Sequence, residues 1–244
     1  CCFKRRCKWI NIKQNLSKRR TPWEKSNQWP IVGKLMNFTD GLFITFEGID
    51  GSGKSTQSQL LYDALNDLGI SAILTREPGG SIGAEIIRSL LVSGDTDRWS
   101  AETEILLFTA ARRDHLEKTI QPALTKNQIV ICDRFVDSTR VYQGVARADL
   151  RQTVDELHSI IIKKEPDITF IIDTDPEKSL TRGLARNSGE DRFEEFGLEF
   201  QKKLRNGFSE LSKTEKSRCH LINGMRSKEE VSNDILNIVK DYTK

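Results

Sequence analysis

The residues with the clearest chemical meaning in this chain form the segment GIDGSGKS, which runs from Gly48 to Ser55. Their spacing fits the pattern G-x-x-x-x-G-K-[ST], in which backbone N–H groups surround an anion, the lysine reaches the β- and γ-phosphates and the last hydroxyl binds Mg²⁺. A glycine-rich turn without a ligand is the alternative, but the apolar run before the segment and the helical pattern after it favour a phosphate site. We therefore predict a cradle for a nucleoside triphosphate made of Gly48, Ile49, Asp50, Gly51, Ser52, Gly53, Lys54, Ser55 and Thr56.

Several classes of protein share such a cradle, so the pattern alone does not say what happens to the triphosphate. The sequence from residue 41 onward contains no N-K-x-D motif for guanine recognition, which argues against a GTPase. A motor or partition ATPase would position a water and would need no pocket for an acceptor. The chain does contain residues that suit an acceptor pocket.

Two polar segments, Arg76–Gly80 and Asp133–Gly144, follow predicted strands and could line this second pocket. The carboxyl ends of parallel strands meet at one edge of a sheet, so both segments are expected beside the cradle. Between them, the helical run ETEILLFTAARRDH places Phe108 and Arg112 on one face, four residues apart. An aromatic ring beside a guanidinium can hold a planar base, although such a phenylalanine could also belong to the core.

From residue 41 onward, short β-rich runs alternate with longer amphipathic segments, which predicts an α/β fold with a parallel five-stranded sheet and helices on both faces. We expect strands at about 42–47, 71–75, 128–132, 168–173 and 219–223. We expect helices at about 54–68, 81–92, 101–117, 118–126, 136–146, 149–163, 176–187, 195–215 and 227–242. Asp175-Pro176 and the pair Ser227 and Glu230 have the residue types and spacing of helix starts.

Charge divides the chain into two parts. Residues 1–40 contain ten lysines or arginines against two acidic residues, whereas residues 41–244 contain 28 basic and 33 acidic side chains. We expect residues 1–40 to lie outside the folded domain as a basic extension that is disordered or foreign to the natural chain, which would then begin at Met36. An organellar transit peptide and a nucleic-acid-binding arm are the alternatives for this extension.

Cysteine usage and hydropathy bear on the location of the protein. Cys132 and Cys219 lie far apart in apolar runs without a C-x-x-C spacing, so we expect buried thiols in a reducing compartment. No apolar run approaches the ~20 residues needed to cross a bilayer. These features predict a cytoplasmic protein.

Five segments together resemble the thymidylate kinase family of the bacterial type: FEGIDGSGKST, TREPGG, FTAARRDH, DRFVDSTRVYQG and RNSGEDRFE. Their order and spacing extend the resemblance over essentially all of residues 41–244. The resemblance implies the P-loop architecture of nucleoside monophosphate kinases, with a lid at about 182–194. It also implies an enzyme that uses MgATP to phosphorylate dTMP to dTDP, usually as a homodimer.

The resemblance further implies how the acceptor would bind. Phe108 would stack on thymine, and Arg112 would bond to the O4 edge of that base. Thr139 and Gln143 would help to fix the pyrimidine, while Tyr142 would pack against the deoxyribose. The other residues implied to contact dTMP are Arg88 and Arg134 at its phosphate and Glu77 and Pro78 in the pocket wall.

Phosphoryl transfer requires cations around the transferring group. Catalytic roles are expected for Lys54, Asp50, Arg134, Arg186 and Arg192, and Mg²⁺ ligation is expected from Ser55 and Asp133. In some members of the family an arginine follows the cradle aspartate, but this chain has Gly51 there. The lid segment RGLARNSGEDRFE supplies Arg182, Arg186 and Arg192 instead, unless it is only a charged surface loop.

Two other functions stay open at this point. One is a kinase for another pyrimidine nucleoside monophosphate, because a single methyl group separates thymine from uracil and is worth only ~1–3 kcal/mol in an apolar pocket. The other is a P-loop module that binds ATP to regulate or assemble a partner, although it would make no use of the acceptor segments.

Three histidines and two arginines near the chemical motifs are assigned no role in catalysis. His115, His158 and His220 lack the spacing of nucleophile or metal sites, so we expect them to be non-catalytic. Arg140 and Arg147 are expected at the surface.

Overall fold

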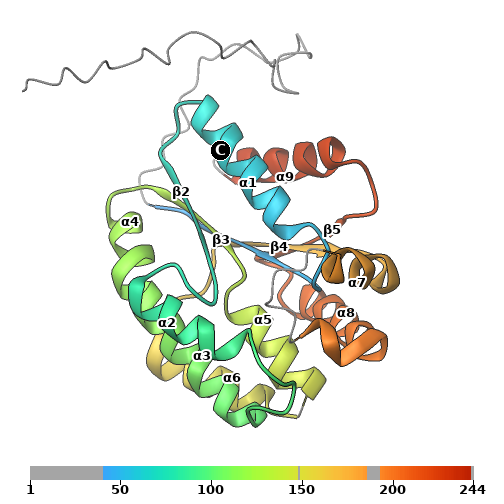
Figure 1. Ribbon diagram of the computed structural model, residues 1–244. Helices are drawn as coiled ribbons and strands as arrows, with labels where there is room; N and C mark the ends of the chain where they lie inside the picture. The colour runs from blue at the N-terminus through green and yellow to red at the C-terminus, as the bar shows by residue number, and fades with distance from the viewer. Residues whose placement is uncertain (1–40, 148, 186–192, 243–244) are drawn as a thin grey trace, which may run out of the picture. The chain divides into compact units, whose positions relative to one another are not determined.

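A parallel β-sheet forms the centre of the fold (Figure 1). The computed structural model describes residues 41–147, 149–185 and 193–242. The strands are β1 (Phe43–Glu47), β2 (Ala72–Arg76), β3 (Ile129–Asp133), β4 (Ile168–Asp173) and β5 (Cys219–Asn223). They lie in the order β2-β3-β1-β4-β5 and all pairs are parallel. The predicted strands are therefore confirmed, with shifts of one residue at most.

The central strands are apolar because both faces of the sheet are covered. All five residues of β1 are buried, as are the first four of β3, which is typical of a parallel sheet between helical layers. Thr45 and Thr169 are buried polar exceptions on neighbouring strands, and their hydroxyl oxygens lie 2.8 Å apart. Each threonine thus satisfies the other inside the sheet.

Helices follow the strands in alternation. The α-helices are α1 (Lys54–Asp67), α2 (Ile82–Leu91), α3 (Ala101–His115), α4 (Gln121–Thr125), α5 (Val136–Val141), α6 (Arg151–Leu157), α7 (Pro176–Leu184), α8 (Gly197–Thr214) and α9 (Lys228–Tyr242). The predicted helix starts at Asp175 and Ser227 are confirmed. Asp175 accepts a hydrogen bond from the Lys178 amide, and Ser227 and Glu230 exchange the two bonds of a capping box.

Three of the predicted helical regions contain a π-helical segment in place of a regular α-helix. The π-helical segments are η2 (Leu116–Ile120), η3 (Tyr142–Arg147) and η4 (His158–Ile162), and a short 3₁₀-helix, η5 (Glu194–Phe196), precedes α8. The boundary expected between residues 117 and 118 is wrong, because α3, η2 and α4 continue into one another without a break. A π-turn shifts the hydrogen-bond register by one residue, which apolar periodicity does not reveal.

Helices cover both faces of the sheet (Figure 1). On one face, α1 and α9 lie side by side, with α1 against the three strands β1–β3 and α9 against β5. Two apolar clusters pack the sheet against the remaining helices, one containing Phe43 and Val130 and the other containing Ile171. One cluster lies under α3 to α6 and the other under α8.

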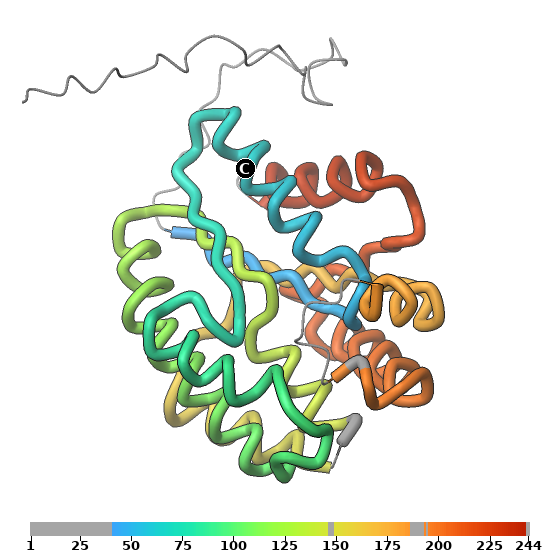
Figure 2. The backbone as a smooth tube through the Cα atoms, viewed as in Figure 1, coloured from blue at the N-terminus to red at the C-terminus, as the bar shows by residue number. Residues whose placement is uncertain are grey.

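The chain reverses sharply at the end of β1. Figure 2 shows the tube turning back there into α1, which then runs along the sheet. Because all strands are parallel, the segments after β1, β2 and β3 meet at the same edge. Within the described residues, no helix combines the length and the apolar character needed to cross a membrane.

Candidate active site

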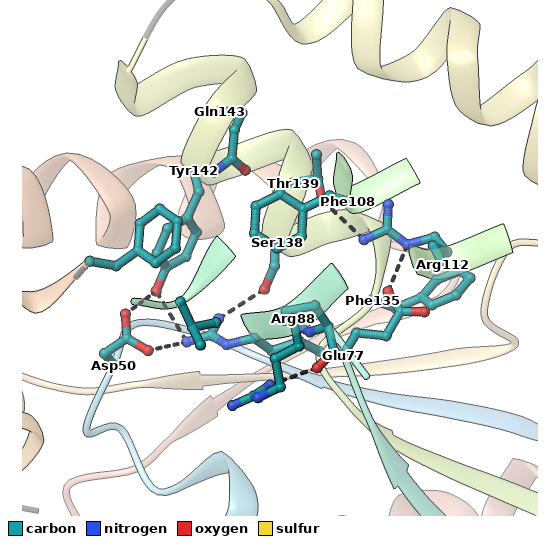
Figure 3. Close-up of a pocket in the computed structure, with 14 residues that line it drawn as sticks. Asp50, Glu77, Arg88, Phe108, Arg112, Phe135, Ser138, Thr139, Tyr142 and Gln143 are labelled. Carbon is teal, nitrogen blue, oxygen red and sulfur yellow. Dashed lines mark hydrogen bonds and ion pairs between the residues drawn. The ribbon is translucent and has the colours of Figure 1, made fainter. Parts of the chain in front are cut away.

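A pocket opens at this edge of the sheet, and the segments after β1, β2 and β3 contribute to its wall (Figure 3). Its cavity volume is about 120 Å³, and the whole concave space, open solvent included, is about 640 Å³. All nine residues expected to contact an acceptor line it. The full lining is Asp50, Glu77, Pro78, Arg88, Val92, Phe108, Arg112, Arg134, Phe135, Ser138, Thr139, Tyr142, Gln143 and Phe193.

The cradle lies next to this pocket, between β1 and α1. Gly48, Gly51 and Gly53 have φ of 132°, 75° and 98°, conformations that side-chain-bearing residues rarely adopt. Lys54 begins α1, and its Nζ donates to the Ile49 carbonyl at 2.7 Å. The buried hydroxyl of Ser52 has no hydrogen-bond partner in the described part of the chain. A turn of this kind, with an unpartnered hydroxyl and a lysine folded over it, suits an anion.

The cradle also contacts helix α7. A Cβ at Gly51 would lie 1.9 Å from the Ser179 carbonyl oxygen, well inside van der Waals contact. No side chain fits at this position unless α7 moves. Close packing of the cradle against α7 is therefore the physical reason why an arginine cannot follow Asp50 in this arrangement.

Two expected metal ligands, Ser55 and Asp133, lie in direct contact. The Ser55 hydroxyl donates to Asp133 Oδ2 at 2.5 Å. Asp133 Oδ1 is buried and has no hydrogen-bond partner among the described residues. Buried carboxylate oxygens are normally paired, and Mg²⁺ prefers oxygen ligands, takes few of them from protein and completes its shell with phosphates and water. These two residues therefore fit a magnesium ion beside the cradle.

Arg134 connects the cradle to the pocket. Its backbone has φ of 72°, in the left-handed region, which is uncommon for a residue with a side chain. The guanidinium donates to the Asp50 carboxylate, to the Gly48 carbonyl at 3.0 Å and to the Ser138 hydroxyl at 2.8 Å. It also lies over the ring of Tyr142, 5.1 Å from its centroid. A cation is thus fixed where the cradle meets the pocket.

Burial and nearby charges shift the pKa values of two cradle residues, Asp50 and Lys54. Burial alone would raise the pKa of Asp50, but the charges of Arg134 and Lys54 and a 2.6 Å hydrogen bond from Tyr142 hold it below its usual value. Burial and the charge of Arg134 lower the pKa of Lys54 to about 8. The site thus holds an ionised Asp50 next to a lysine whose charged form is disfavoured.

Glu47 bonds to two neighbours of Arg134, Phe135 and Ser138, and this role was not predicted from the sequence. Its carboxylate is fully buried at the end of β1, where it accepts from the Phe135 amide at 2.8 Å and from the Ser138 hydroxyl at 2.6 Å. Burial, and then the nearby charge of Asp137, raise its pKa to about 7. An acidic residue at the end of an apolar strand was the available signal in the sequence.

Arg112 is hydrogen-bonded to two other residues expected in the acceptor pocket, Glu77 and Thr139. Arg112 donates from Nε to Glu77 at 2.7 Å and from Nη2 to Thr139 at 3.0 Å, and its side chain is almost fully buried. His115 lies one turn further along α3, within 3.0 Å of the second Glu77 oxygen and 2.7 Å of the Thr75 hydroxyl. It therefore holds the Glu77 loop in place, a structural contact that its spacing in the sequence did not indicate.

Other expected acceptor residues surround the pocket (Figure 3). Arg88 on α2 donates from Nη1 to the Pro78 carbonyl at 2.6 Å, which anchors its side chain beside the Glu77 loop. Phe108 is partly exposed and lies 6.3 Å from the Phe193 ring, so one side of the pocket is aromatic. Gln143 is buried on the wall formed by η3.

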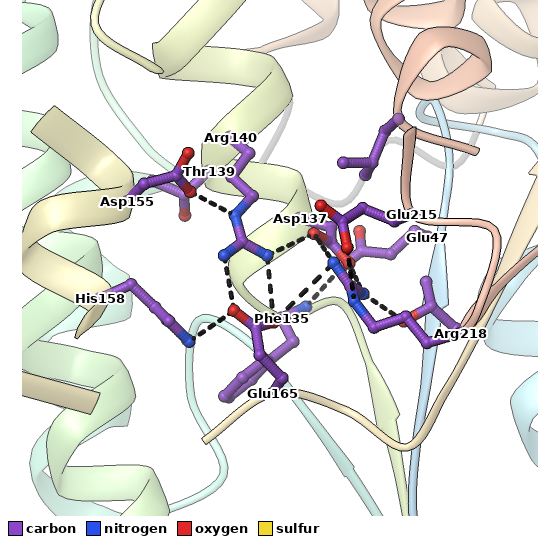
Figure 4. Close-up of polar contacts among 12 residues, drawn as sticks. Glu47, Phe135, Asp137, Thr139, Arg140, Asp155, His158, Glu165, Glu215 and Arg218 are labelled. Atoms are coloured by element: carbon purple, nitrogen blue, oxygen red, sulfur yellow. Dashed lines mark hydrogen bonds and ion pairs between the residues drawn. The ribbon is translucent and has the colours of Figure 1, made fainter. Parts of the chain in front are cut away.

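The expectation that Arg140 lies at the surface is wrong. Arg140 is buried and donates to Asp137, Asp155 and Glu165 (Figure 4). Arg218 also donates to Asp137, at 2.6 Å. Burial alone would raise the pKa of Asp137, but Arg218 and Arg140 keep it below its ordinary value. The cluster joins α5, which carries pocket residues, to α6 and the segment before β5.

The expected lid is only partly described. Arg182 is exposed on α7, where its Nε donates to the Lys178 carbonyl at 3.2 Å. Arg186 and Arg192 lie outside the described residues, as do residues 1–40 and the side chain of Arg147.

Two other predictions concern residues away from the pocket. Thr56, expected in the cradle, is exposed in the first turn of α1. Cys132 and Cys219 are confirmed as buried free thiols.

Comparison with known proteins gives one consistent result. The family model described as "Thymidylate kinase" matches residues 46–235. The thymidylate kinase of Dinoroseobacter shibae is 64% identical over 196 residues, which cover 80% of this chain and 95% of that protein. The thymidylate kinase of Ruegeria pomeroyi is 58% identical over 199 residues, covering 82% and 94%.

A solved structure agrees with these relatives. The crystal structure of thymidylate kinase from Ehrlichia chaffeensis matches with a TM-score of 0.66 and 37% sequence identity. The match covers 82% of this chain and 99% of that one.

Proposed function

The chain belongs to the thymidylate kinase family, and we propose that it transfers the γ-phosphoryl group of MgATP to dTMP, giving dTDP and ADP. One observation carries this proposal: the pocket that contains Phe108, Arg112 and Gln143 adjoins the phosphate cradle, and Arg134 belongs to both. A protein that only hydrolysed or sensed ATP would have no need for the second pocket.

The acceptor half would bind dTMP in an extended position. Phe108 would stack on the thymine ring, and Arg112 would donate to O4. Its guanidinium is already oriented by Glu77 and Thr139. At the other end, Arg134 and Arg88 would receive the 5′-phosphate, and Tyr142 would pack against the deoxyribose.

The donor half would hold the triphosphate of ATP. The amides of Gly48–Ser55 would surround the β-phosphate, and Lys54 would leave the Ile49 carbonyl to reach the β- and γ-oxygens. Negative charge from the triphosphate would raise the lysine's lowered pKa and keep it protonated. Ser55 and Asp133 would hold the magnesium ion, which would supply positive charge beside the triphosphate.

Arginines of the protein would lower the electrostatic repulsion between the dTMP phosphate and the ATP triphosphate. Arg134 would neutralise the acceptor phosphate, while its bonds to Asp50, Gly48 and Ser138 prevent it from swinging away. Arg186 and Arg192 are proposed to contact the transferring group when the lid, about residues 182–194, closes. Closure would also exclude the water that would otherwise hydrolyse ATP.

A panel of acceptors tests this function. The full chain would be incubated with MgATP and with dTMP, dUMP, dCMP or thymidine, and ADP release would be measured. We expect release to depend on an acceptor and to be fastest with dTMP. Equal turnover of dUMP would widen the substrate class, whereas activity on thymidine alone, or ATP hydrolysis that no monophosphate stimulates, would contradict the proposal.

We also propose that the enzyme is a homodimer. Ile82, Ile86 and Leu90 form an exposed apolar stripe on α2, with Ile82 87% and Ile86 65% exposed. Leu106 on α3 and Ile160 on η4 are exposed too, and α3 contacts both α2 and η4. Exposed apolar side chains on neighbouring helices are typical of an interface, and a two-fold dimer would pair this surface with itself.

Sedimentation would test the dimer with two matched variants. Ile86→Lys should convert a species of about twice 27.8 kDa into the monomer, because it buries a charge in the interface. Leu221→Lys, at an exposed apolar position on β5 outside the stripe, should leave the mass unchanged. A monomeric wild type, or a dimer that survives Ile86→Lys, would contradict the proposed surface.

The remaining proposals concern the extent and location of the enzyme. We propose that residues 41–244 form the kinase domain, that residues 1–40 lie outside it, and that catalysis takes place in the cytoplasm. We propose no membrane partner, and nucleic acid would enter only through the basic residues 1–40.

A further inference from the structure

A buried carboxylate lies directly behind the base-binding end of the pocket. Gln143 lines the pocket on its η3 wall, and its Nε2 donates to Glu104 Oε2 at 2.9 Å. Gln143 is 1% exposed and Glu104 is 0% exposed, and Glu104 is not part of the lining. The glutamate is on α3, one turn before Phe108, so it reaches Gln143 from the same helix that carries the proposed stacking ring.

The chemistry of this bond fixes the direction of the amide. A glutamine side chain presents NH₂ on one side and C=O on the other, and the two ends are interchangeable unless a neighbour distinguishes them. A carboxylate only accepts hydrogen bonds, so it selects the orientation in which the NH₂ group faces Glu104. The carbonyl oxygen, Oε1, is then left as an acceptor for whatever else lies beside Gln143.

An acceptor at this place discriminates between bases. Thymine and uracil carry a donor at N3–H next to the acceptor O4, whereas cytosine has an acceptor at N3 next to a 4-amino donor. Arg112, held by Glu77 and Thr139, offers only donors. Together, Oε1 of Gln143 and the Arg112 guanidinium complement the 4-keto pattern. In cytosine, the acceptor Oε1 would face the acceptor N3, and the donor guanidinium would face the 4-amino donor.

We propose that Glu104 is a positioning residue that sets the base specificity of the enzyme: by holding the Gln143 amide in one orientation, it selects 4-keto over 4-amino pyrimidine monophosphates. The inference rests on the proposed phosphorylation of dTMP. It assigns Glu104 no contact with substrate. A site built to hydrogen-bond a substrate rejects a mismatched one strongly, because the buried groups are left unpaired.

The test compares kcat/KM for dTMP and dCMP in wild type and Glu104→Gln. The amide introduced by this substitution can accept or donate, so Gln143 becomes free to turn its NH₂ toward the base. We expect the dTMP-to-dCMP ratio to fall at least tenfold, mainly through a higher KM for dTMP, with kcat for dTMP within threefold of wild type. Glu102→Gln, an exposed residue on the same first turn of α3, is the matched control and should leave the ratio unchanged.

A double variant that exchanges the two side chains provides a second test in case Glu104→Gln alone does not fold. We call this variant the swapped pair. In Glu104→Gln combined with Gln143→Glu, the amide now on α3 donates to the carboxylate now on η3, which still presents an acceptor to N3–H. A dTMP-to-dCMP ratio restored to within threefold of wild type would support the proposal. Equal losses for dTMP and dCMP in Glu104→Gln, or a swapped pair that discriminates no better than that variant, would overturn it. A wild type without dTMP turnover would instead refute the proposed function.

Discussion

At the scale of single residues, the site depends on how its charges hold one another in place. Arg134 has a left-handed backbone and bonds to Asp50, Gly48 and Ser138, so the position of its guanidinium is determined before any phosphate arrives. Such preorganisation lowers the cost of bringing two anions together, because no cation has to be reoriented during the reaction. The position of Arg134 therefore also depends on Glu47, because the Ser138 hydroxyl that accepts from Arg134 donates to the Glu47 carboxylate.

Glu47 should make the stability of the protein depend on pH. Its folded-state pKa of about 7 lies above the ordinary 4.5, so between these values the folded state keeps a proton that the unfolded state has released. The stability due to this proton is complete below pH 4.5 and is lost as pH rises through 7. The free energy of unfolding of wild type minus that of Glu47→Gln should therefore fall by on the order of 2 kcal/mol between pH 5 and pH 8.

Urea denaturation of both proteins across this pH range measures the difference. Glu102→Gln, at an exposed position on α3, serves as the control substitution. A gap between wild type and Glu47→Gln that stays constant from pH 5 to pH 8 would show that Glu47 does not titrate in this window.

Residue types and spacing predicted Phe108 and Arg112 in the pocket lining, and the family resemblance added seven more lining residues, but neither predicted the supports behind them. Phe108 and Arg112 were found because they share a helix face and have the chemistry of a base site. Glu47 and Glu104 were not found, because their roles follow from complete burial and from partners 88 and 39 residues away. Arg140 was misplaced for the same reason, since two of its three carboxylate partners come from later segments.

At the scale of elements, the contact between the cradle and α7 is the least adaptable feature. Gly51 has φ of 75° and leaves no space for a Cβ, which would meet the Ser179 carbonyl oxygen. Ser179 belongs to α7, the helix in whose last turn the proposed lid begins. The arrangement explains why the cation for the transferring group is expected from the lid rather than from the residue after Asp50.

A pair of glycine substitutions would measure the cost of this contact. Gly51→Ala and Gly69→Ala introduce the same strain in φ, because the two residues have φ of 75° and 74°. Only Gly51 meets a neighbour, whereas a Cβ at Gly69 would have open space. We expect Gly69→Ala to cost about 1–2 kcal/mol of unfolding free energy and Gly51→Ala at least twice as much. Equal costs in thermal or urea unfolding would argue against tight packing on α7.

Elements were easier to predict than their fine structure. The central strands β1, β3 and β4 are short apolar runs that are almost fully buried, so their positions follow from the apolar pattern. The edge strands β2 and β5 are less buried, but each is still a short run between helical segments. The strand order requires knowledge of which strands pair, and the π-helical segments require knowledge of the hydrogen-bond register. Tyr142 and Gln143 lie in such a segment, so the geometry of this pocket wall could not be predicted from periodicity.

At the scale of the whole molecule, one sheet edge brings together two binding sites of different character. The cradle is made of backbone amides and one lysine, whereas the pocket is made mainly of side chains from α2, α3, α5 and η3 and from the segments that follow β1, β2 and β3. They meet at Asp50, Arg134 and Asp133, which come from the ends of two neighbouring strands. The account therefore requires two nucleotides bound end to end, with their phosphates at this junction.

A crystal structure with dTMP and a non-hydrolysable ATP analogue would test this requirement most directly. We predict thymine on Phe108 between Arg112 and Gln143, the 5′-phosphate at Arg134, and the γ-phosphate of the analogue at Lys54, facing the acceptor. An analogue in the cradle with dTMP absent from the pocket at saturating concentration, or bound elsewhere on the protein, would contradict the account.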